Sequence, residues 1–267
     1  MFWKRKIANN DRVIREAMAN QDQRSPSQQA LPNSPRHEDI RQQVEFATMT
    51  SPQRVWALCD AIDRISQLEI EGDIVECGVW RGGSMMAAAK SLLYHGDCSR
   101  SLWLFDTFEG MTKPETQDVD HNGNLASQLL DSTERIEDSV WCIAGLEEVK
   151  TNLHTTGYPQ ENLKFVAGPV EQTLLNDEIL PDQIALLRLD TDWYRSTLLE
   201  LETLFPRLVP GGVLIIDDYG HWQGCQQAVD EYFEANGISM ELNAIDYTGR
   251  IGIKQAEMLA GEVERVA

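Results

Sequence analysis

The stretch that decides the fold is residues 72–84, which read GDIVECGVWRGGS. Its first part, residues 73–77, is a short apolar run typical of a buried strand, and residues 84–94 follow with apolar residues at helical spacing. The glycines between them allow a tight turn, and a helix start offers free N–H groups to a ligand. The spacing matches neither G-x-G-x-x-G nor a P-loop. We therefore predict a strand–turn–helix unit whose turn binds a ligand.

Apolar runs alternate with helical patterns on both sides of this stretch. Further strands are expected at residues 101–105, 163–167, 185–189 and 212–216, and helices at residues 55–65, 170–175, 196–208 and 225–235. Buried strands that alternate with helices predict an α/β fold with a parallel sheet covered on both faces. A hairpin at residues 240–245 and 249–254 would add antiparallel strands at one edge.

The composition excludes several classes of partner. The chain has 267 residues and a net charge of −20, from 23 Lys and Arg against 43 Asp and Glu. Nucleic acids and anionic membranes repel such a surface, so we expect neither as a partner. The five cysteines are scattered, and no apolar run is long enough for a signal peptide or a membrane span. These features predict a cytoplasmic protein.

Two segments depart from the alternating pattern. Residues 1–43 are an N-terminal extension, largely polar, for which the alternatives are a mobile tail, an oligomerisation arm or a lid. Residues 44–267 are expected to form one domain, with an insertion around residues 112–160 that is either a lid or an ordinary surface excursion. The amphipathic N-terminus favours a homo-oligomer.

Acidic residues accompany the first two predicted strands. Glu76 adjoins the glycine turn, where a carboxylate would repel a phosphate but suit a cationic amine. Asp106 ends the second strand, a position from which a carboxylate can accept both hydroxyls of a ribose, although Asp is also a common helix cap. Together these features indicate a nucleoside with an amino-acid end, which describes S-adenosylmethionine (SAM).

More carboxylates follow the fourth and fifth predicted strands, at Asp190, Asp192, Asp217 and Asp218. Carboxylates gathered at one place repel each other unless they are protonated or paired with a basic group or a cation. A divalent ion such as Mg²⁺, which prefers carboxylates and waters, would resolve this repulsion. The alternative is a solvated acidic edge in which Asp192 caps a helix.

Five blocks of sequence occur in order: GDIVECGVWRGGS, LFDTFEGM, LRLDTDWYRST, PGGVLIIDDYGHW and AVDEYF. They resemble the macrocin O-methyltransferase (TylF-type) family over roughly residues 44–255. The resemblance implies a Rossmann-like class I methyltransferase fold with a mostly parallel seven-stranded sheet. It also implies a SAM- and Mg²⁺-dependent enzyme that methylates a hydroxyl of a small molecule, most often a sugar hydroxyl of a glycosylated natural product.

The resemblance also implies the residues of the site. The metal ligands would be Asp190, Asp217 and Asp218. The cofactor site would comprise Met49, Glu76, Gly78, Val79, Ser84 and Asp106. Asp190 is the first candidate for the base that removes the hydroxyl proton. His221 is the second, because an unperturbed histidine titrates near neutral pH, although it could also be an ordinary loop residue.

Three other functions stay open from the sequence. The D-x-D pattern of Asp190 and Asp192 is also typical of metal-dependent glycosyltransferases, although Glu76 would then face a diphosphate. A catechol or polyphenol O-methyltransferase would use similar chemistry. A SAM-binding protein without turnover is the non-catalytic alternative.

Overall fold

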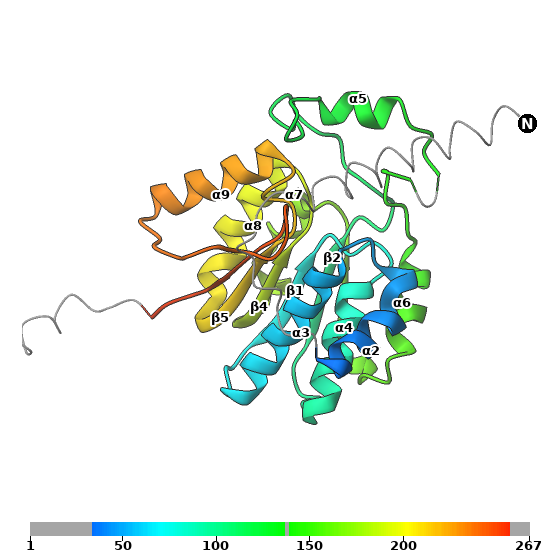
Figure 1. Cartoon of the computed structure of the whole chain (residues 1–267), viewed down its shortest axis with the longest axis vertical. Coiled ribbons are helices and arrows are strands. Elements are labelled where there is room, and N and C mark those ends of the chain that lie inside the picture. Colours follow the sequence, from blue (N-terminus) through cyan, green and yellow to red (C-terminus); the bar gives the residue numbers. More distant parts are fainter. Residues whose placement is uncertain (1–33, 137–138, 257–267) are drawn as a thin grey trace, which may run out of the picture. The chain divides into compact units, whose positions relative to one another are not determined.

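The computed structural model describes residues 34–136 and 139–256, which belong to one compact unit. Its centre is a seven-stranded sheet in the order β3-β2-β1-β4-β5-β7-β6 (Figure 1). The strands from β3 to β5 are parallel, whereas β7 is antiparallel to both β5 and β6. This arrangement confirms the predicted mostly parallel sheet with an antiparallel hairpin at its edge.

All the predicted strands are present. Their bounds are β1 (Asp73–Cys77), β2 (Leu102–Asp106), β3 (Leu163–Ala167), β4 (Ile184–Leu189), β5 (Leu208–Ile216), β6 (Asn243–Ala244) and β7 (Arg250–Ile253). Strand β5 begins earlier than predicted and β6 is shorter. The order of the strands brings the carboxyl ends of β1, β2, β4 and β5 to the same edge, where a ligand site is expected in an open α/β sheet.

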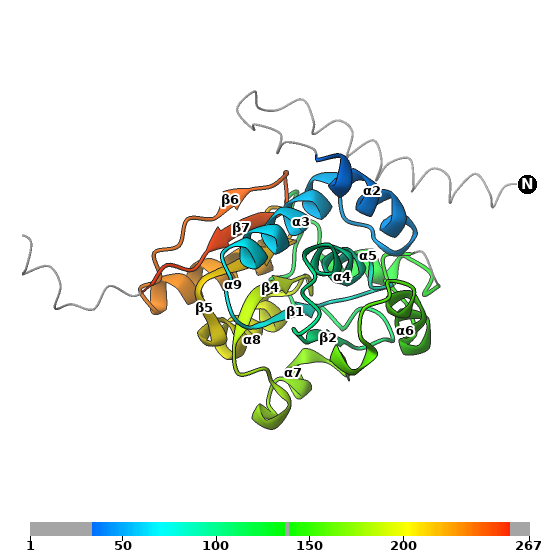
Figure 2. The same ribbon diagram turned by 90° about the horizontal axis from the view of Figure 1, so that it is seen from below.

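Helices cover both faces of this sheet. Their bounds are α2 (Pro35–Val44), α3 (Pro52–Gln67), α4 (Gly83–His95), α5 (Ala126–Asp131), α6 (Leu146–His154), α7 (Val170–Thr173), α8 (Tyr194–Leu204) and α9 (Gln223–Ala235), with 3₁₀ turns at Glu45–Ala47, Gln160–Asn162, Asp177–Ile179 and Phe205–Arg207. Figure 2 shows α3 and α4 on one side of the strands and α8 on the other. Among the described residues, none of the helices has the length and apolar character needed to cross a bilayer.

Alternation along the strands builds two cores, one on each face. Ile74 packs into the core beneath α3 and α4, whereas its neighbour Val75 packs into the core beneath α8 and α9. Ile215 and Ile216 divide in the same way at the end of β5. Since both faces are covered, the strands are mostly apolar, and the charged residues within them and at their carboxyl ends stand out.

Helix α2 belongs to the folded unit, which therefore begins before the predicted boundary at Val44. Ile40 and Val44 are buried in the core beneath α3 and α4. His37 is also buried, and its Nε2 lies 2.9 Å from the carboxylate of Asp63 on α3. Residues 1–33 of the predicted extension lie outside the described residues.

The insertion predicted around residues 112–160 contains α5 and α6, and its first part is anchored to the carboxyl edge of the sheet. The buried carboxylate of Asp118 accepts hydrogen bonds from the backbone N–H groups of Glu115 (2.7 Å) and of Tyr194 (2.8 Å), the first residue of α8. A β-carbon on Gly224, at the start of α9, would lie 2.3 Å from Asp118 Oδ1. Asp118 therefore occupies a space that only glycine leaves open between the starts of two helices.

Replacement of Asp118 by alanine should release this part of the insertion. The change leaves two backbone donors without their partner, which costs about 1–3 kcal/mol in the free energy of unfolding. We expect a lower midpoint in urea and faster proteolysis within residues 112–136. The exposed Asp131→Ala is the matched control. If both variants are cleaved at the rate of the parent protein, Asp118 does not anchor the insertion.

Candidate functional site

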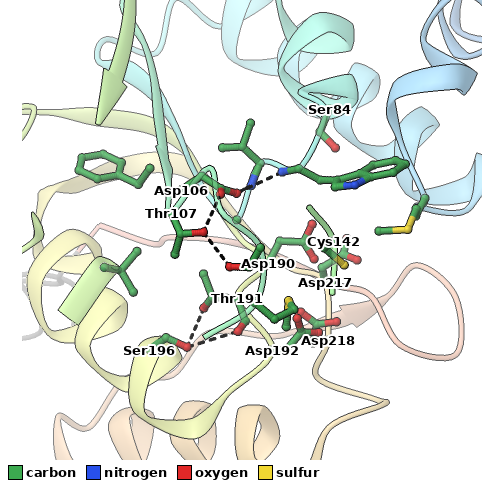
Figure 3. Close-up of a pocket in the computed structure, with 18 of the residues that line it drawn as sticks. Ser84, Asp106, Thr107, Cys142, Asp190, Thr191, Asp192, Ser196, Asp217 and Asp218 are labelled. Carbon is green, nitrogen blue, oxygen red and sulfur yellow. Dashed lines mark hydrogen bonds between the residues drawn. The ribbon is translucent and has the colours of Figure 1, made fainter. Parts of the chain in front are cut away.

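A cavity of about 240 Å³ opens at the carboxyl ends of β1, β2, β4 and β5. Eight of the predicted site residues line it: Met49, Gly78, Val79, Ser84, Asp106, Asp190, Asp217 and Asp218. Figure 3 shows the last three grouped together, with Ser84 and Asp106 on the other side of the cavity. The structure thus brings most of the predicted residues to one place. The two exceptions are Glu76 and His221.

The turn after β1 requires glycine at its first position. Gly78 has a φ of +81°, and a β-carbon there would lie 1.9 Å from the carbonyl oxygen of Asp190. Trp80 and Gly82 also have positive φ angles, of 46° and 88°. A non-glycine residue in this conformation is uncommon and tends to mark a functional site. The close approach of two backbones therefore fixes the shape of the turn beside the cavity.

Asp106, at the end of β2, holds this turn in place. Its Oδ2 accepts hydrogen bonds from the backbone N–H groups of Val79 (2.6 Å) and Trp80 (3.1 Å), and its Oδ1 accepts one from the N–H of Phe108 (2.6 Å). Burial raises the pKa of the Asp106 carboxyl, while these N–H groups favour its ionised form. Asp106 stabilises the glycine turn, a role that the prediction of ribose binding did not include.

Glu76 is buried and is not part of the cavity wall. Its Oε1 accepts a hydrogen bond from Nη1 of Arg188 at 2.7 Å. Burial raises the pKa of Glu76 to about 7, and the positive charge of Arg188 opposes this shift. We expected Glu76 to face a ligand, but its partner in the structure is an arginine of the chain. Glu76 Oε2 has no hydrogen-bond partner in the described part of the chain, so one oxygen stays open.

Arg188, on β4, joins carboxylates from three strands. Its Nη1 also donates to Asp190 Oδ2 at 2.6 Å, and its Nη2 donates to Asp217 Oδ1. The guanidinium is buried, and the neighbouring carboxylates raise its pKa despite the opposing effect of burial. A basic partner therefore relieves part of the repulsion among the acidic residues, which the sequence had left as one of three alternatives.

Arg54, on α3, is a second basic partner. Its Nη1 forms an ion pair with Asp217 Oδ2, and its Nε lies 3.0 Å from Asp246 Oδ2. Neither arginine was predicted from the sequence as part of the site. A signal existed for Arg188, because a lone charge within the apolar run of β4 requires a buried partner. No local signal existed for Arg54, since its contacts join residues far apart in the chain.

The three predicted metal ligands fit a divalent cation. One oxygen from each of Asp190, Asp217 and Asp218 lies within 4.8 Å of the others. Asp218 Oδ2 is buried and has no hydrogen-bond partner among the described residues, so its lone pairs are unsatisfied by the chain. Burial raises the pKa of Asp190 and of Asp218, because it disfavours their charged forms. A bound divalent cation would stabilise those charges. Three carboxylates are the oxygen donors that Mg²⁺ prefers.

Asp192 is a further carboxyl of the site, which was considered from the sequence as a helix cap or as part of a glycosyltransferase D-x-D pattern. Trp193, not Asp192, is the N-cap residue of α8, and the N–H of Tyr194 is accepted by Asp118. Asp192 lines the cavity instead, with a φ of 68°, and its Oδ1 accepts a hydrogen bond from the indole N–H of Trp222 at 2.8 Å. Burial, reinforced by the charge of Asp190, raises its pKa to about 7. The D-x-D spacing was the signal that could have identified it.

His221 lies in an aromatic cluster outside the cavity wall. Its Nδ1 is 3.2 Å from the hydroxyl of Tyr247, and the centroid of its ring is 5.1 Å from that of His121 and 4.8 Å from that of Trp222. Burial lowers the pKa of His221 to about 4. The structure therefore does not support His221 as the second candidate base.

The segment before α3 connects the glycine turn to the acidic residues. A β-carbon on Gly83 would lie 2.5 Å from the carbonyl oxygen of Ala47, so this segment packs directly on the start of α4. Met49 lines the cavity between them with a largely exposed side chain. Thr50 then reaches Asp217, with Oγ1 3.4 Å from Oδ1. Both halves of the cavity thus share one wall.

Comparison with known proteins gives a consistent family. The family model described as macrocin-O-methyltransferase (TylF) matches residues 3–251. The 8-demethyl-8-(2,3-dimethoxy-alpha-L-rhamnosyl)-tetracenomycin-C 4'-O-methyltransferase of Streptomyces olivaceus is 36% identical over 203 residues, which are 76% of this chain and 73% of the relative. The mycinamicin III 3''-O-methyltransferase of Micromonospora griseorubida is 32% identical over 202 residues, 76% of each chain.

A solved structure agrees with these relatives. The O-methyltransferase NovP superposes with a TM-score of 0.66 and 30% sequence identity, covering 79% of this chain and 83% of that chain. A methyltransferase of calicheamicin, CalS11, superposes with a TM-score of 0.56 at 18% identity and shows the similarity of fold alone.

Glu76 should make the protein less stable as the pH rises, when neither metal nor cofactor is bound. Its pKa of about 7 in the fold exceeds the ordinary value of 4.5, so between these values the folded chain binds more protons than the unfolded chain. The free energy of unfolding then falls with rising pH, by on the order of 2 kcal/mol between about pH 5.5 and about pH 8. Urea denaturation in EDTA measures this slope.

Glu76→Gln should reduce that slope, whereas substitution of the exposed Glu71 by glutamine should leave it unchanged. Equal slopes in the parent protein and Glu76→Gln would show that Glu76 is ionised in the fold throughout this range.

Proposed function

The chain belongs to the macrocin-O-methyltransferase (TylF) family and is a methyltransferase, and from this we propose that it methylates a sugar hydroxyl of a glycosylated small molecule, with SAM as donor and Mg²⁺ at the carboxylate triad. The observation that carries the proposal is a single cavity with a glycine turn on one side and Asp190, Asp217 and Asp218 on the other. The sugar acceptor is supported by the relative from S. olivaceus, which is named for a rhamnosyl-bearing compound.

The glycine turn would hold the cofactor, whose chemical contribution is an electrophilic methyl group. Gly78 lets the backbone approach the ligand, and the conformation of the turn is fixed in advance because Asp106 accepts its N–H groups. Glu76 does not line the cavity, but its buried Oε2 has no hydrogen-bond partner among the described residues and is one acceptor left for a cationic amine. Met49, which lines the cavity with a largely exposed side chain, would contact the ligand. Such fixed positions help to align donor and acceptor, which supplies a large share of the acceleration in transfer reactions.

Asp190, Asp217 and Asp218 would hold the metal ion, which when bound lowers the pKa of an acceptor hydroxyl and fixes its position. The carboxylates of this site are held in position by the protein itself, without a bound ion. Arg188 fixes the carboxylates of Asp190 and Asp217 from beneath, and it prevents their repulsion from separating the ends of β4 and β5.

Asp192 is better suited than Asp190 to accept the proton of the acceptor hydroxyl. Asp190 accepts a hydrogen bond from Arg188 and is assigned to the metal ion, so its oxygens are already engaged. Asp192 forms no ion pair with Arg54 or Arg188, lines the cavity, and is oriented by the indole of Trp222. Its pKa of about 7 lies near the value that suits a general base at neutral pH.

The alternatives from the sequence are less well supported. The relatives are methyltransferases, so the D-x-D pattern does not indicate a glycosyltransferase. The three carboxylates grouped at the cavity, which fit a metal ion, argue against a binding protein without turnover. The relative from S. olivaceus, which is named for a rhamnosyl-bearing compound, favours a sugar hydroxyl over a catechol.

An assay of SAM consumption against glycosides, their aglycones and simple catechols tests the proposed function. We expect turnover with glycosides only, in the presence of Mg²⁺, and its loss in EDTA. Asp217→Asn should lower the rate by roughly two to three orders of magnitude, because it removes a charged ligand of the ion that activates the hydroxyl. Asp182→Asn, an exposed residue on the loop before β4, is the matched control.

Calorimetric titration with SAM accompanies this assay, and the affinity of Asp217→Asn for SAM should stay close to that of the parent protein. Turnover of catechols without turnover of glycosides would overturn the sugar acceptor. Full activity in EDTA would overturn the role of the metal.

Asp192→Asn should lower the maximal rate by roughly 10²–10⁴-fold, the usual contribution of a general base. Binding of SAM and of Mn²⁺ should persist, because Asp192 is not assigned to either site. The rate of the parent protein should rise with pH as Asp192 loses its proton, at a pH below the value of about 7 that holds without the ion, because the ion offsets the charges of Asp190 and Asp217. This rise should be absent in the variant. A variant that keeps both the parent rate and the parent pH profile would return the role to Asp190.

A further inference from the structure

Arg54 lies where the predicted metal site meets the rest of the cavity wall. It lines the cavity from α3, and its guanidinium contacts two carboxylates. One is Asp217 at the end of β5, and the other is Asp246 in the turn between β6 and β7, 3.0 Å from Nε. The side chain is only 10% exposed, so these contacts are shielded from solvent.

Asp246 is held independently of Asp217. Its Oδ2 accepts a hydrogen bond from the hydroxyl of Ser51 at 2.6 Å, and its Oδ1 accepts hydrogen bonds from the N–H groups of Thr248 (3.0 Å) and Gly249 (2.7 Å). A β-carbon on Gly249 would lie 2.8 Å from Cδ of Arg54, so the arginine packs closely on this turn. Asp246 is therefore a fixed anchor for the guanidinium.

Arg54 and Arg188 both pair with Asp217, but they differ in the other ion pairs that each would lose if it moved away. Arg188 pairs with three carboxylates, and its departure would leave buried charges without a partner, including that of Glu76. Arg54 would keep its ion pair with Asp246 if it gave up Asp217. Of these two cations, Arg54 is the one that can yield a carboxylate oxygen to an incoming ion.

We propose that Arg54 is an exchangeable internal cation of the metal site. It neutralises Asp217 while no divalent ion is bound, and it gives up Asp217 Oδ2 when an ion binds, while Asp246 retains the guanidinium. The inference rests on the proposed function, because it requires a divalent ion at the triad. Arg54 is thus a positioning residue that sets the affinity for the ion, since a positive charge at this distance opposes a second cation.

The test measures Mn²⁺ binding to the full chain by electron paramagnetic resonance of the free ion, without cofactor or acceptor. Mn²⁺ accepts the same oxygen ligands as Mg²⁺. Arg54→Gln should bind Mn²⁺ at least about tenfold more tightly than the parent protein, because the competing charge is removed. Asp246→Asn should bind it several-fold more weakly, because Arg54 then has Asp217 as its main partner.

The double variant Arg54→Gln/Asp246→Asn should bind Mn²⁺ like Arg54→Gln, since Asp246 acts through Arg54. Arg41→Gln, on α2 and paired with Glu38, should match the parent protein. Asp246→Asn retains Arg54 and nearly the same volume, so it tests the inference even if Arg54→Gln does not fold, which circular dichroism would reveal.

Weaker binding by Arg54→Gln, or unchanged binding by Asp246→Asn, would overturn the exchange while leaving the metal site intact. If none of these proteins, the parent included, binds Mn²⁺, the metal part of the proposed function falls together with this inference.

Discussion

The site depends on the ion pairs that Arg188 makes beneath it. A parallel sheet brings the carboxyl ends of its strands to one edge, and here that edge carries Glu76, Asp190 and Asp217. Their mutual repulsion would oppose the pairing of β1, β4 and β5 if they were ionised without a partner. One guanidinium contacts all three, so strand pairing and charge neutralisation stabilise each other.

Arg188 does not neutralise every carboxylate of the cavity, and the carboxyls that it does not contact can bind a cation or accept a proton. Among the described residues, neither Asp192 nor Asp218 forms an ion pair with an arginine, and both carboxyls have raised pKa values because they are buried. Such a group either keeps a proton or recruits a cation. In the proposed function, Asp218 recruits the divalent ion and Asp192 takes up the proton of the acceptor hydroxyl. The ends of β4 and β5 can therefore serve both metal binding and proton transfer.

Much of the fold could be predicted from the sequence, because its signals are local. The alternation of apolar strands and helices, the glycine turn after β1 and the edge hairpin all depend on residues close together in the chain. Helix α2 was harder to predict, because its composition is polar and its buried positions are few, among them Ile40 and Val44. Without knowledge of its neighbours α3 and α4, this helix reads as part of a solvated extension.

Most residues of the site could be predicted from the sequence, but the residues that they contact could not. Asp106 was expected to bind a ribose, whereas in the structure its carboxylate accepts hydrogen bonds from the backbone of the glycine turn. Glu76 was expected to face a ligand, and it pairs with Arg188. His221 follows the acidic pair by only a few residues, yet its ring packs in an aromatic cluster. Tertiary contacts decide where a side chain points and which residue it pairs with, and the spacing of residues along the chain does not show these contacts.

The central claim is that Asp190, Asp217 and Asp218 together bind one divalent ion beside the cofactor. Anomalous diffraction from crystals grown with Mn²⁺ and S-adenosylhomocysteine tests it most directly. The account predicts a single strong anomalous peak within coordination distance of all three carboxylates, with the cofactor against the glycine turn at Gly78. A bound cofactor with no anomalous peak at this triad, or a peak elsewhere in the chain, would contradict it.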